Sequence, residues 1–341
     1  MINRPRFFAV TALALAGLAV AGCSSSSSSP SAASSPSGSG SAANAVNLSA
    51  VTLDVGDQKG TGAEAVLSAA GLLSTLPFHV VWSDFTSGPP MLEAMASGSV
   101  DIGGVGDAPP VFAASGGEQV EIVGARQTNG DQDAVVVPKN SPITSISQLK
   151  GKKIAYGSGS SGNYNLLTVL TKAGLTTKDV TLVNLQPAEA LAAFTSGGVD
   201  AWDIWPPYVQ QVVAQDSARV LATGSGYGSP YSFEVASRAA LADPGKAAAI
   251  RDLISLIAQA HTWATTHQAA WAKVWAQASG LPLNVMTKAT ADDTLVAVPI
   301  TPAVISAEQQ VSNAFTTAGL IPVQVNFSNY ISTQFNSAVS P

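Results

Sequence analysis

Cysteine is almost missing from this chain of 341 residues, which contains a single one, Cys23. One thiol cannot close an internal disulfide or build a thiolate metal site. Histidine is also scarce, because the sequence has only His79, His261 and His267. The last two are six positions apart on expected helical sequence, so they point to different faces and do not form a metal pair. We therefore expect no bound metal and no cofactor.

Charged residues make up only 11% of the chain, and 22 acidic residues face 16 basic ones. The formal net charge of −6 argues against nucleic acid, which requires a basic surface. No Gly-x-Ser-x-Gly elbow is present. An extracytoplasmic enzyme or a sensor built on the same fold are alternatives, but we find no nucleophile, general base or metal set, and we expect no catalytic residues.

The N-terminal segment 1–22 resembles a bacterial lipoprotein signal. Arg4 and Arg6 precede an apolar run, Phe7 to Val20, that is too short to span a bilayer comfortably, and small residues lead to Cys23. In such signals the cysteine becomes the acylated first residue of the mature chain. The resemblance implies an extracytoplasmic protein with a lipid anchor in the cell membrane; a transmembrane anchor or an ordinary secretory signal are the alternatives.

A low-complexity stretch follows the cysteine. Residues 23–45 are almost entirely Ser, Ala, Gly and Pro, which cannot bury apolar area, so we expect a flexible tether. Its ~20 residues have a root-mean-square reach of roughly 25 Å. The folded part then begins near Val46, and its roughly 295 residues suit two lobes better than one core.

A weak internal repeat also indicates two lobes. The segment Leu92–Asp101 reappears as Leu191–Asp200, and each copy reads as a helix, a Gly stop and a strand that leads to a Pro-rich loop. A supersecondary unit used once per lobe explains this similarity, and chance likeness of Ala/Gly-rich helix ends is the alternative.

Strands and helices alternate along the chain, which is typical of an α/β fold with a mostly parallel sheet covered on both faces. We expect a two-lobed clamshell with two crossing strands, near 133–137 and 232–236. The first lobe would comprise 46–136, the second 137–232, and the return part with C-terminal helices 233–341. The expected strands are 51–55, 79–85, 100–105 and 120–125 in the first lobe, and 154–156, 180–185, 200–204 and 219–222 in the second.

Five loops follow the carboxyl ends of these strands, where open α/β sheets bind ligands. Three belong to the first lobe and two to the second, so a shared cleft is expected. The loops are 57–62, 86–90, 106–110, 157–164 and 202–208.

The loop Gly157-x-Gly159-x-x-Gly162 matches a dinucleotide fingerprint. The next strand, however, ends in Asn184 rather than the acid that would hold a ribose, and Asn163 stands where a P-loop requires lysine. What remains is a helix N-terminus that favours a small anion. A plain helix cap without ligand is the alternative.

The tryptophans divide into two groups. Trp263, Trp271 and Trp275 lie on helical sequence and are expected in the core. Trp202 and Trp205 flank the carboxyl end of an expected strand, and we predict that they line the pocket.

Four runs resemble the aliphatic sulfonate-binding proteins of ABC importers, within the nitrate-, sulfonate- and taurine-binding group. The runs are Gly56-Asp57-Gln58-Lys59, Ser87–Ala94, Val100–Pro110 and Asp200–Tyr208. The resemblance spans about Val51 to Pro322 and implies a type II periplasmic-binding fold, an ABC permease as partner and a small anionic ligand, with an aliphatic sulfonate first. Taurine, nitrate, bicarbonate or a pyrimidine are alternatives. This chain has Trp205-Pro206-Pro207-Tyr208 where the family pattern usually has Trp-Asp-Pro-Tyr, with Asp203 placed earlier.

The resemblance also implies a set of ligand-binding residues. Lys59 would add positive charge or remain a solvated lysine, and Asp107 would cap the next helix or receive a ligand amine. Asp203 is a further candidate. Donors to the sulfonate head group would come from Gln58, Ser87, Gly88, Asp107, Ala108, Ser160, Ser161 and Asn163, and the organic tail would be enclosed by Trp202, Trp205, Tyr164 and Tyr231.

Overall fold

The computed structural model describes residues 46–58, 62–215, 217–226, 228–292 and 295–339. The chain from Val46 onward forms one compact unit. Cys23, the tether and Lys59 lie outside the described residues. No helix among the described residues is long and apolar enough to cross a membrane.

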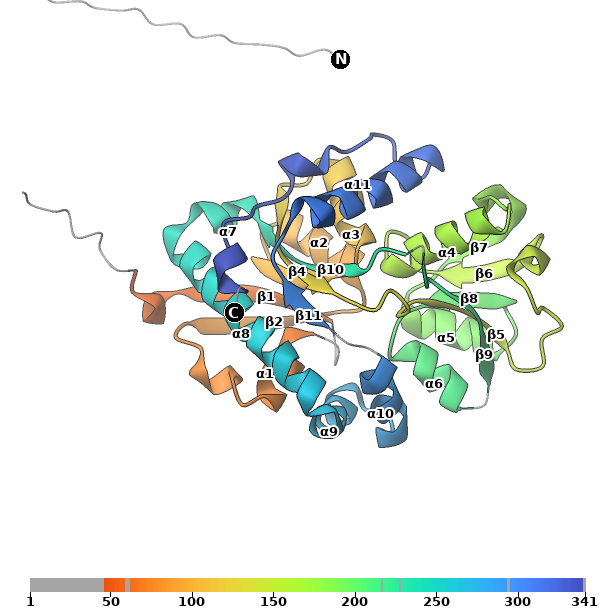
Figure 1. Cartoon of the computed structure of the whole chain (residues 1–341), viewed down its shortest axis with the longest axis horizontal. Helices are drawn as coiled ribbons and strands as arrows, with labels where there is room; N and C mark the ends of the chain where they lie inside the picture. Colours follow the sequence, from red (N-terminus) through yellow and green to blue (C-terminus); the bar gives the residue numbers. More distant parts are fainter. Residues whose placement is uncertain (1–45, 59–61, 216, 227, 293–294, 340–341) are drawn as a thin grey trace, which may run out of the picture. The chain divides into compact units, whose positions relative to one another are not determined.

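The first lobe is built on a six-stranded sheet with the strand order β11-β4-β10-β3-β1-β2 (Figure 1). β1 is parallel to both β2 and β3, whereas β10 is antiparallel to β3 and β4. The strands are β1 (Thr52–Gln58), β2 (His79–Phe85), β3 (Ile102–Val105), β4 (Val120–Gln127), β10 (Tyr231–Ser237) and β11 (Val296–Val298).

Helices cover both faces of this sheet. α2 (Gly88–Ala96), α3 (Ala108–Gly116) and α11 (Pro302–Thr317) bury Met91, Val111 and Phe315 on one face. α1 (Ala63–Ala69) and α8 (Pro244–Thr266) bury Leu67 and Ile250 on the other. α7 (Arg238–Ala242) and α9 (Gln268–Ser279) complete this lobe, and α10 (Leu283–Asp292) packs against α9 and against the second lobe.

The second lobe has a five-stranded sheet with the order β7-β6-β8-β5-β9. β6 is parallel to β7 and β8, and β5 is antiparallel to β8 and β9. The elements are β5 (Ala134–Pro138), β6 (Lys153–Tyr156), α4 (Ser161–Lys172), β7 (Thr181–Asn184), α5 (Pro187–Thr195), β8 (Ala201–Ile204), α6 (Tyr208–Ala214) and β9 (Ala218–Thr223).

The alternation of side chains along β5 shows how this sheet is buried on both faces. Val135 and Val137 pack towards α4, whereas Ala134 and Val136 pack towards α5 and α6. Period-two alternation of this kind is the rule in strands, and a strand apolar at every position is typical of a sheet covered on both sides.

The chain passes between the sheets twice, from β4 to β5 and from β9 back to β10. The predicted α/β architecture with two sheets and two crossings is therefore confirmed. The short strand β11 was missed. Its three residues, just before Pro299, are too few to show a strand pattern.

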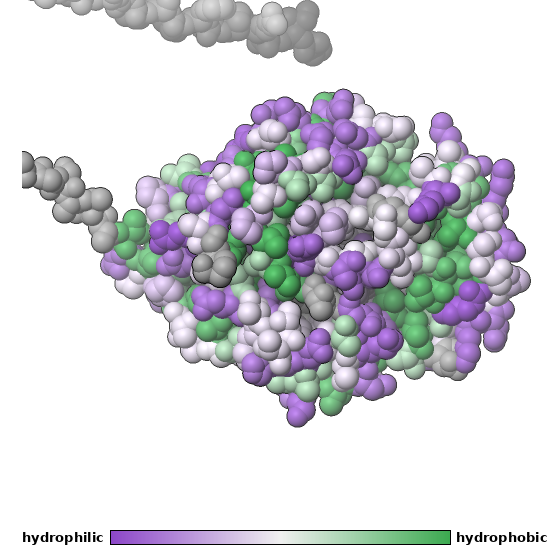
Figure 2. All heavy atoms as spheres, in the orientation of Figure 1, coloured by the Kyte–Doolittle hydropathy of each residue, from purple (hydrophilic) through white to green (hydrophobic). Residues whose placement is uncertain are grey.

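The surface shown in Figure 2 mixes hydrophilic and hydrophobic residues over both lobes. Large apolar side chains that are strongly exposed come from different elements, for example Val81 in β2 and Leu283 in α10. Scattered apolar residues of this kind are ordinary and do not define a docking surface.

Candidate functional site

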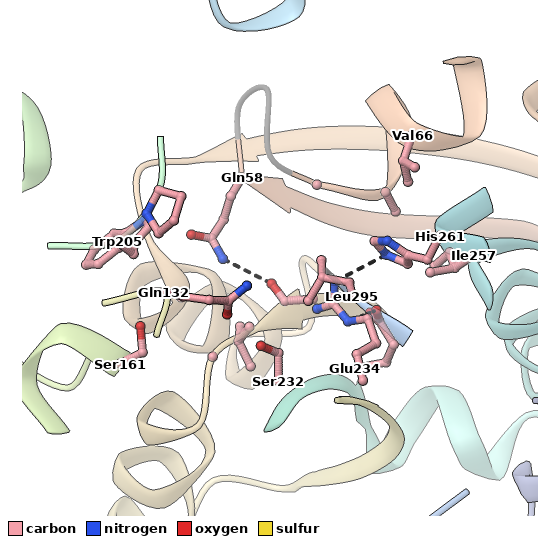
Figure 3. Close-up of a pocket in the computed structure, with 18 of the residues that line it drawn as sticks. Gln58, Val66, Gln132, Ser161, Trp205, Ser232, Glu234, Ile257, His261 and Leu295 are labelled. Carbon is pink, nitrogen blue, oxygen red and sulfur yellow. Dashed lines mark hydrogen bonds and ion pairs between the residues drawn. The ribbon is translucent and has the colours of Figure 1, made fainter. Parts of the chain in front are cut away.

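The main cavity has a volume of about 150 Å³ and is lined by residues of both lobes. At one end, called the outer end below, lie Ser161 and Trp205 from the second lobe (Figure 3). At the other, called the inner end, lie Val66, Ile257 and His261 from the first lobe. Pockets for drug-sized ligands enclose roughly 300–1,000 Å³. A cavity this small suits a ligand of few atoms.

Three helices begin at the outer end of the cavity. Gly88 opens α2, Pro109 lies in the first turn of α3, and Ser161 opens α4, and all three residues line the cavity. The first turn of a helix carries unpaired backbone N–H groups and the positive end of the helix dipole. Three such ends around one space favour an anion.

A buried carboxylate lies between the end of β1 and the start of α1. Asp57 accepts hydrogen bonds from the backbone N–H groups of Gln58 (2.8 Å) and Glu64 (3.0 Å), and burial raises its pKa to about 7. A Cβ on Gly62 would lie 1.0 Å from Asp57 Oδ1. A larger residue at this position would have to displace the Asp57 carboxylate. Gly62 and Ala63 line the cavity.

A buried ion pair lies in the wall formed by the first sheet. Arg126 Nε in β4 is 3.3 Å from Glu234 Oε1 in β10, and their side chains are 12% and 5% exposed. Arg126 Nε nevertheless makes no hydrogen bond with this carboxylate, so the contact is an ion pair only. Burial raises the pKa of Glu234, while the nearby Arg126 lowers it. The pair contributes no net charge to the cavity.

Gly104 in β3 makes room for the ion pair. It is paired with Glu234 across the sheet, and a Cβ on it would lie 3.1 Å from Arg126 Nη2 and 3.2 Å from Glu234 Oε2. The two charged heads therefore lie over Gly104, which itself lines the cavity. Its carbonyl also accepts a hydrogen bond from Gln58 Nε2 at 3.1 Å (Figure 3).

Two further titratable groups line the cavity. His261 Nε2 lies 3.4 Å from Arg126 Nη1, and burial, reinforced by the Arg126 charge, lowers the histidine pKa to about 3. His261 is therefore neutral at physiological pH. Burial raises the pKa of Asp133 to about 6, against the effect of its hydrogen bond with Ser161.

The cavity brings together five of the predicted site residues. Gln58 comes from β1, Gly88 from α2, Ser160 and Ser161 from the start of α4, and Trp205 from the loop after β8. Ser160 caps α4, since its Oγ accepts from Asn163 N at 3.3 Å and donates to Gly157 O at 2.7 Å. The prediction that both lobes contribute to one cleft agrees with this placement.

Three predicted residues lie instead at a neighbouring cavity of about 50 Å³. Asp107, Tyr164 and Tyr231 line it, and they do not line the main one. Burial raises the pKa of Asp107 well above its usual range, and the nearby Asp133 adds to this. Asp107 stands at the N-cap of α3, but its side chain makes no cap hydrogen bond, so the expected capping role is wrong.

Trp202 and Asp203 are not at the cavity, which corrects their predicted placement. Both belong to β8, whose side chains alternate between two covered faces. Trp202 is 1% exposed and packs near Phe194 and Tyr208, with ring centroids 6.1 and 5.9 Å away. Asp203 is fully buried on the opposite face, where it accepts a hydrogen bond from Asn165 Nδ2 at 2.9 Å.

The remaining predicted residues play supporting parts. Ser87 Oγ donates to Gln186 Oε1 of the second lobe at 3.0 Å. Asn163 Oδ1 accepts from Gly159 N at 3.1 Å and so holds the loop before α4. Ala108 is fully buried between two cavity residues, Gly106 and Pro109.

Several cavity residues were missed from the sequence. Trp271 and Trp275, expected in the core, line the cavity together with Thr290 from α10. Arg126 and Glu234 were also missed, although a charged residue within an apolar crossing strand such as β10 is an unusual feature that could have singled out Glu234. Among the described residues, no group of three or more His, Cys, Asp or Glu side chains could hold a metal ion.

Comparisons with known proteins agree with this arrangement. A family model described as NMT1/THI5 like matches residues 87–270. A protein of Escherichia coli (strain K12), provisionally named an aliphatic sulfonates-binding protein, is 32% identical over 287 residues, which cover 83% of this chain and 89% of that protein.

Two solved structures are also similar. The alkanesulfonate-binding protein of Xanthomonas axonopodis pv. citri bound to MOPS is 34% identical, with a TM-score of 0.77 over 82% of this chain and 98% of that one. The periplasmic aliphatic sulphonate binding protein of Escherichia coli is 31% identical, with a TM-score of 0.72 over 82% and 92%.

Proposed function

Since the chain belongs to the NMT1/THI5-like family and, within it, to the sulfonate-binding proteins of ABC importers, we propose that it captures a small aliphatic sulfonate in the main cavity. It is a binding protein of a transporter and not an enzyme. The type II periplasmic-binding fold implied by the sequence is confirmed.

The observation that carries the proposal is the convergence of the α2, α3 and α4 N-termini on a small cavity. A sulfonate is permanently ionised and its oxygens are weakly basic, so several neutral N–H dipoles suit it better than one strong counter-ion. The Pro89-Pro90 and Pro109-Pro110 pairs have no N–H. Gly88 and Ala108, just before them, are therefore the natural donors of these two helices.

The proposed arrangement places the head group at these helix ends, near Gln58, Ser160 and Ser161. Trp205 covers it from the second lobe. The organic tail extends towards Val66, Ile257 and Trp271, which form an apolar wall at the inner end. Closure of the lobes about the two crossings completes the enclosure.

The same proposal includes the N-terminal segment. Acylation of Cys23 anchors the protein outside the cytoplasm, the segment 23–45 serves as tether, and the folded part delivers its ligand to an ABC permease. The basis is the lipoprotein-like signal and the composition of the tether. The predicted lobe bounds, 46–136 with 233–341 and 137–232, fall within the crossing strands, since β5 (Ala134–Pro138) belongs to the second sheet and β10 (Tyr231–Ser237) to the first.

Calorimetry on the folded part, from Val46 onward, tests the ligand. The panel contains ethanesulfonate, taurine, nitrate, bicarbonate and a pyrimidine, with propionate as a matched carboxylate. The expected result is tightest binding of the alkanesulfonate, with propionate clearly weaker. If nitrate, bicarbonate or the pyrimidine binds more tightly than every sulfonate, the proposed ligand is wrong while the binding fold remains.

A further inference from the structure

The inner end of the cavity has a polar side, which the first sheet supplies. Phe233 and Val235 of β10 point into the core that α2, α3 and α11 cover. Because successive side chains of a strand point to opposite faces, Ser232 and Glu234 point the other way, and both line the cavity (Figure 3). Arg126 of β4 pairs with Ser232 across the sheet and also lines the cavity. A ligand that reaches the inner end therefore meets polar groups on this side.

The carboxylate of Glu234 accepts no hydrogen bond from any residue that the structure describes. Arg126 Nε lies 3.3 Å from Oε1, but this contact is an ion pair only. The Glu234 side chain is 5% exposed, yet both of its oxygens keep accessible surface of their own, unlike the sealed carboxylate oxygens of Glu308. Since Glu234 lines the cavity, a ligand can reach this carboxylate. A donor on the ligand would satisfy an acceptor that the described residues leave unsatisfied.

Two hydrogen-bond donors lie beside this carboxylate. His261 Nε2 is 3.4 Å from Arg126 Nη1, and Nε2 must accept because a guanidinium can only donate. Burial lowers the pKa of His261 to about 3, so the ring is neutral and its one proton is on Nδ1. Within the described part of the chain, His261 Nδ1 and Arg126 Nη2 have no acceptor, and neither atom is sealed from accessible space. The inner end thus offers the ligand both an acceptor and donors.

The charges of this cluster favour a neutral group on the ligand. Arg126 and Glu234 neutralise each other, and His261 is uncharged. An ammonium on the ligand would bring a second positive charge beside Arg126, and a carboxylate would bring a second negative charge beside Glu234. A buried charge requires a counter-ion of its own, and these two are already paired. A hydroxyl is neutral and can both donate and accept, so it matches the whole cluster.

We propose that the inner end of the cavity selects sulfonates whose far end carries a hydroxyl group, and that Glu234 determines this preference by accepting a hydrogen bond from it. Arg126 or His261 donates to the hydroxyl oxygen. The apolar side chains of Val66, Ile257 and Trp271 pack against the carbon chain between the two polar ends. This inference rests on the proposed function and narrows the ligand class to hydroxyalkanesulfonates.

Isothermal titration with sulfonates that differ only in their terminal group tests the inference. The set is 3-hydroxypropane-, 3-fluoropropane- and 3-aminopropane-1-sulfonate with butane-1-sulfonate, and it is repeated with one carbon fewer and one carbon more. At the best length, the hydroxyl compound is expected to bind roughly tenfold more tightly than the alkane, because it donates to a carboxylate. The fluoride has a similar size but cannot donate, so it should bind like the alkane. The ammonium compound should bind more weakly than the hydroxyl compound.

Three results of this titration would overturn the inference while leaving sulfonate binding intact. The first is a hydroxyl compound that binds no more tightly than the alkane at any of the three lengths. The second is a fluoride that gains as much as the hydroxyl compound, and the third is an ammonium compound that binds more tightly at the best length. If no sulfonate in the set binds, the proposed function itself fails.

Variants assign the preference to Glu234. The double variant Arg126→Met, Glu234→Leu replaces the ion pair by apolar side chains and should bring the hydroxyl-to-alkane affinity ratio close to one. Its matched control is Arg238→Met, Glu121→Leu, which removes another ion pair of the same two strands (Arg238 Nε to Glu121 Oε1, 3.1 Å) away from the cavity. The control should keep the native ratio. A native ratio in the first double variant would contradict the role of Glu234.

A milder change covers the case in which the first double variant does not fold. Glu234→Gln keeps the size of the side chain but removes its charge, and it should lower the hydroxyl-to-alkane ratio severalfold, since a neutral acceptor makes a weaker hydrogen bond. The ratio is taken within each variant, so a modest change in stability does not affect it. An unchanged ratio in Glu234→Gln would also contradict the inference.

Discussion

Ser87 and Gln186 join the two lobes by a hydrogen bond, in which Ser87 Oγ donates to Gln186 Oε1 at 3.0 Å. Thr86 Oγ1 donates to the same oxygen at 2.8 Å. Ser87 stands at the N-cap of α2 in the first lobe, and Gln186 stands at the N-cap of α5 in the second. The amide oxygen of Gln186 thus holds two hydroxyls across the gap between the lobes.

Removal of these two donors should weaken ligand binding by favouring an open arrangement. The double variant Thr86→Val, Ser87→Ala leaves the Gln186 cap of α5 in place. Two partly exposed hydrogen bonds are worth about 1–2 kcal/mol together, so affinity should fall by roughly five- to thirtyfold. Small-angle scattering without ligand should show a larger radius of gyration. Thr75→Val is the control, because the Thr75 hydroxyl bonds only locally to Leu72 O. An unchanged affinity in the double variant would contradict the proposed role of the two hydrogen bonds between the lobes.

Trp205 and Trp202 should respond to truncation in opposite ways. Trp205→Ala removes a cavity wall and should lower ligand affinity by about 1–3 kcal/mol with little change in melting. Trp202→Ala opens a hole in the core of the second lobe and should lower the free energy of unfolding by about 3–5 kcal/mol. Thermal unfolding and titration of both variants provide the comparison. A stable Trp202→Ala protein with lost affinity would reverse the assignment.

Sulfonate affinity should decline as pH rises through about 6. The pKa of Asp133 is raised to about 6 by burial, so this cavity residue is largely protonated at pH 5 and ionised at pH 7.5. The ligand keeps its charge throughout, and the ionised carboxylate repels it by about 1–2 kcal/mol at an effective dielectric constant near 20. Titrations from pH 5 to 8 measure the decline. His261, with a pKa of about 3, stays neutral over this range.

The variant Asp133→Asn should flatten that profile and bind more tightly than the native protein at pH 7.5. Asp131→Asn, a nearby change of the same kind at an exposed position, should keep the native profile. A native affinity that is constant from pH 5 to 8 would show that Asp133 does not face the bound anion.

His261 should make the fold sensitive to acid. Its folded pKa of about 3 lies below the unfolded value of 6.5, so the unfolded chain binds a proton between these values and the folded chain does not. Stability from this residue is complete above pH 6.5 and is lost as pH falls towards 3, with a slope of up to about 1.4 kcal/mol per pH unit. Raised carboxyl pKa values, such as that of Asp57 at about 7, act in the opposite direction.

Comparison with a variant separates the two contributions. His261→Gln should reduce the rise in the free energy of unfolding with pH across that window, measured by denaturant titrations at pH 4 and 6.5. His267→Gln is the matched control, because this histidine is exposed. Identical pH dependence in the native protein and His261→Gln would contradict the buried neutral state of the ring.

The sequence predicted the positions of most strands well, because β1, β2 and β3 each end at a Gly/Pro loop that leads to a helix. The apolar run of β5 predicted a strand, and the Gly-rich motif before α4 predicted the start of a helix. The loops after the strands and the family resemblance together singled out Gln58, Gly88, Ser160, Ser161 and Trp205, and these five residues line one cavity. That they contact a ligand stays a prediction.

The direction of single side chains was harder to predict. Trp202 and Trp205 are three positions apart, yet the first lies within β8 and the second follows it. The prediction placed both at the carboxyl end of the strand and expected both to line the pocket, and so it missed that Trp202 points into the α5/α6 face. Trp275 was expected in the core and its place at the cavity was missed. Helical spacing shows that a face is buried, but it does not show whether a cavity or another part of the protein lies against that face.

A crystal structure of the folded part with an alkanesulfonate, with the sulfur located by its anomalous signal, tests the central claim most directly. We expect the sulfur at the outer end of the main cavity, with sulfonate oxygens within hydrogen-bond distance of N–H groups at the α2, α3 and α4 N-termini and the tail directed towards Trp271 and Trp275. Density for the sulfonate at the neighbouring cavity of Asp107 and Tyr164, or outside both lobes, would contradict the account.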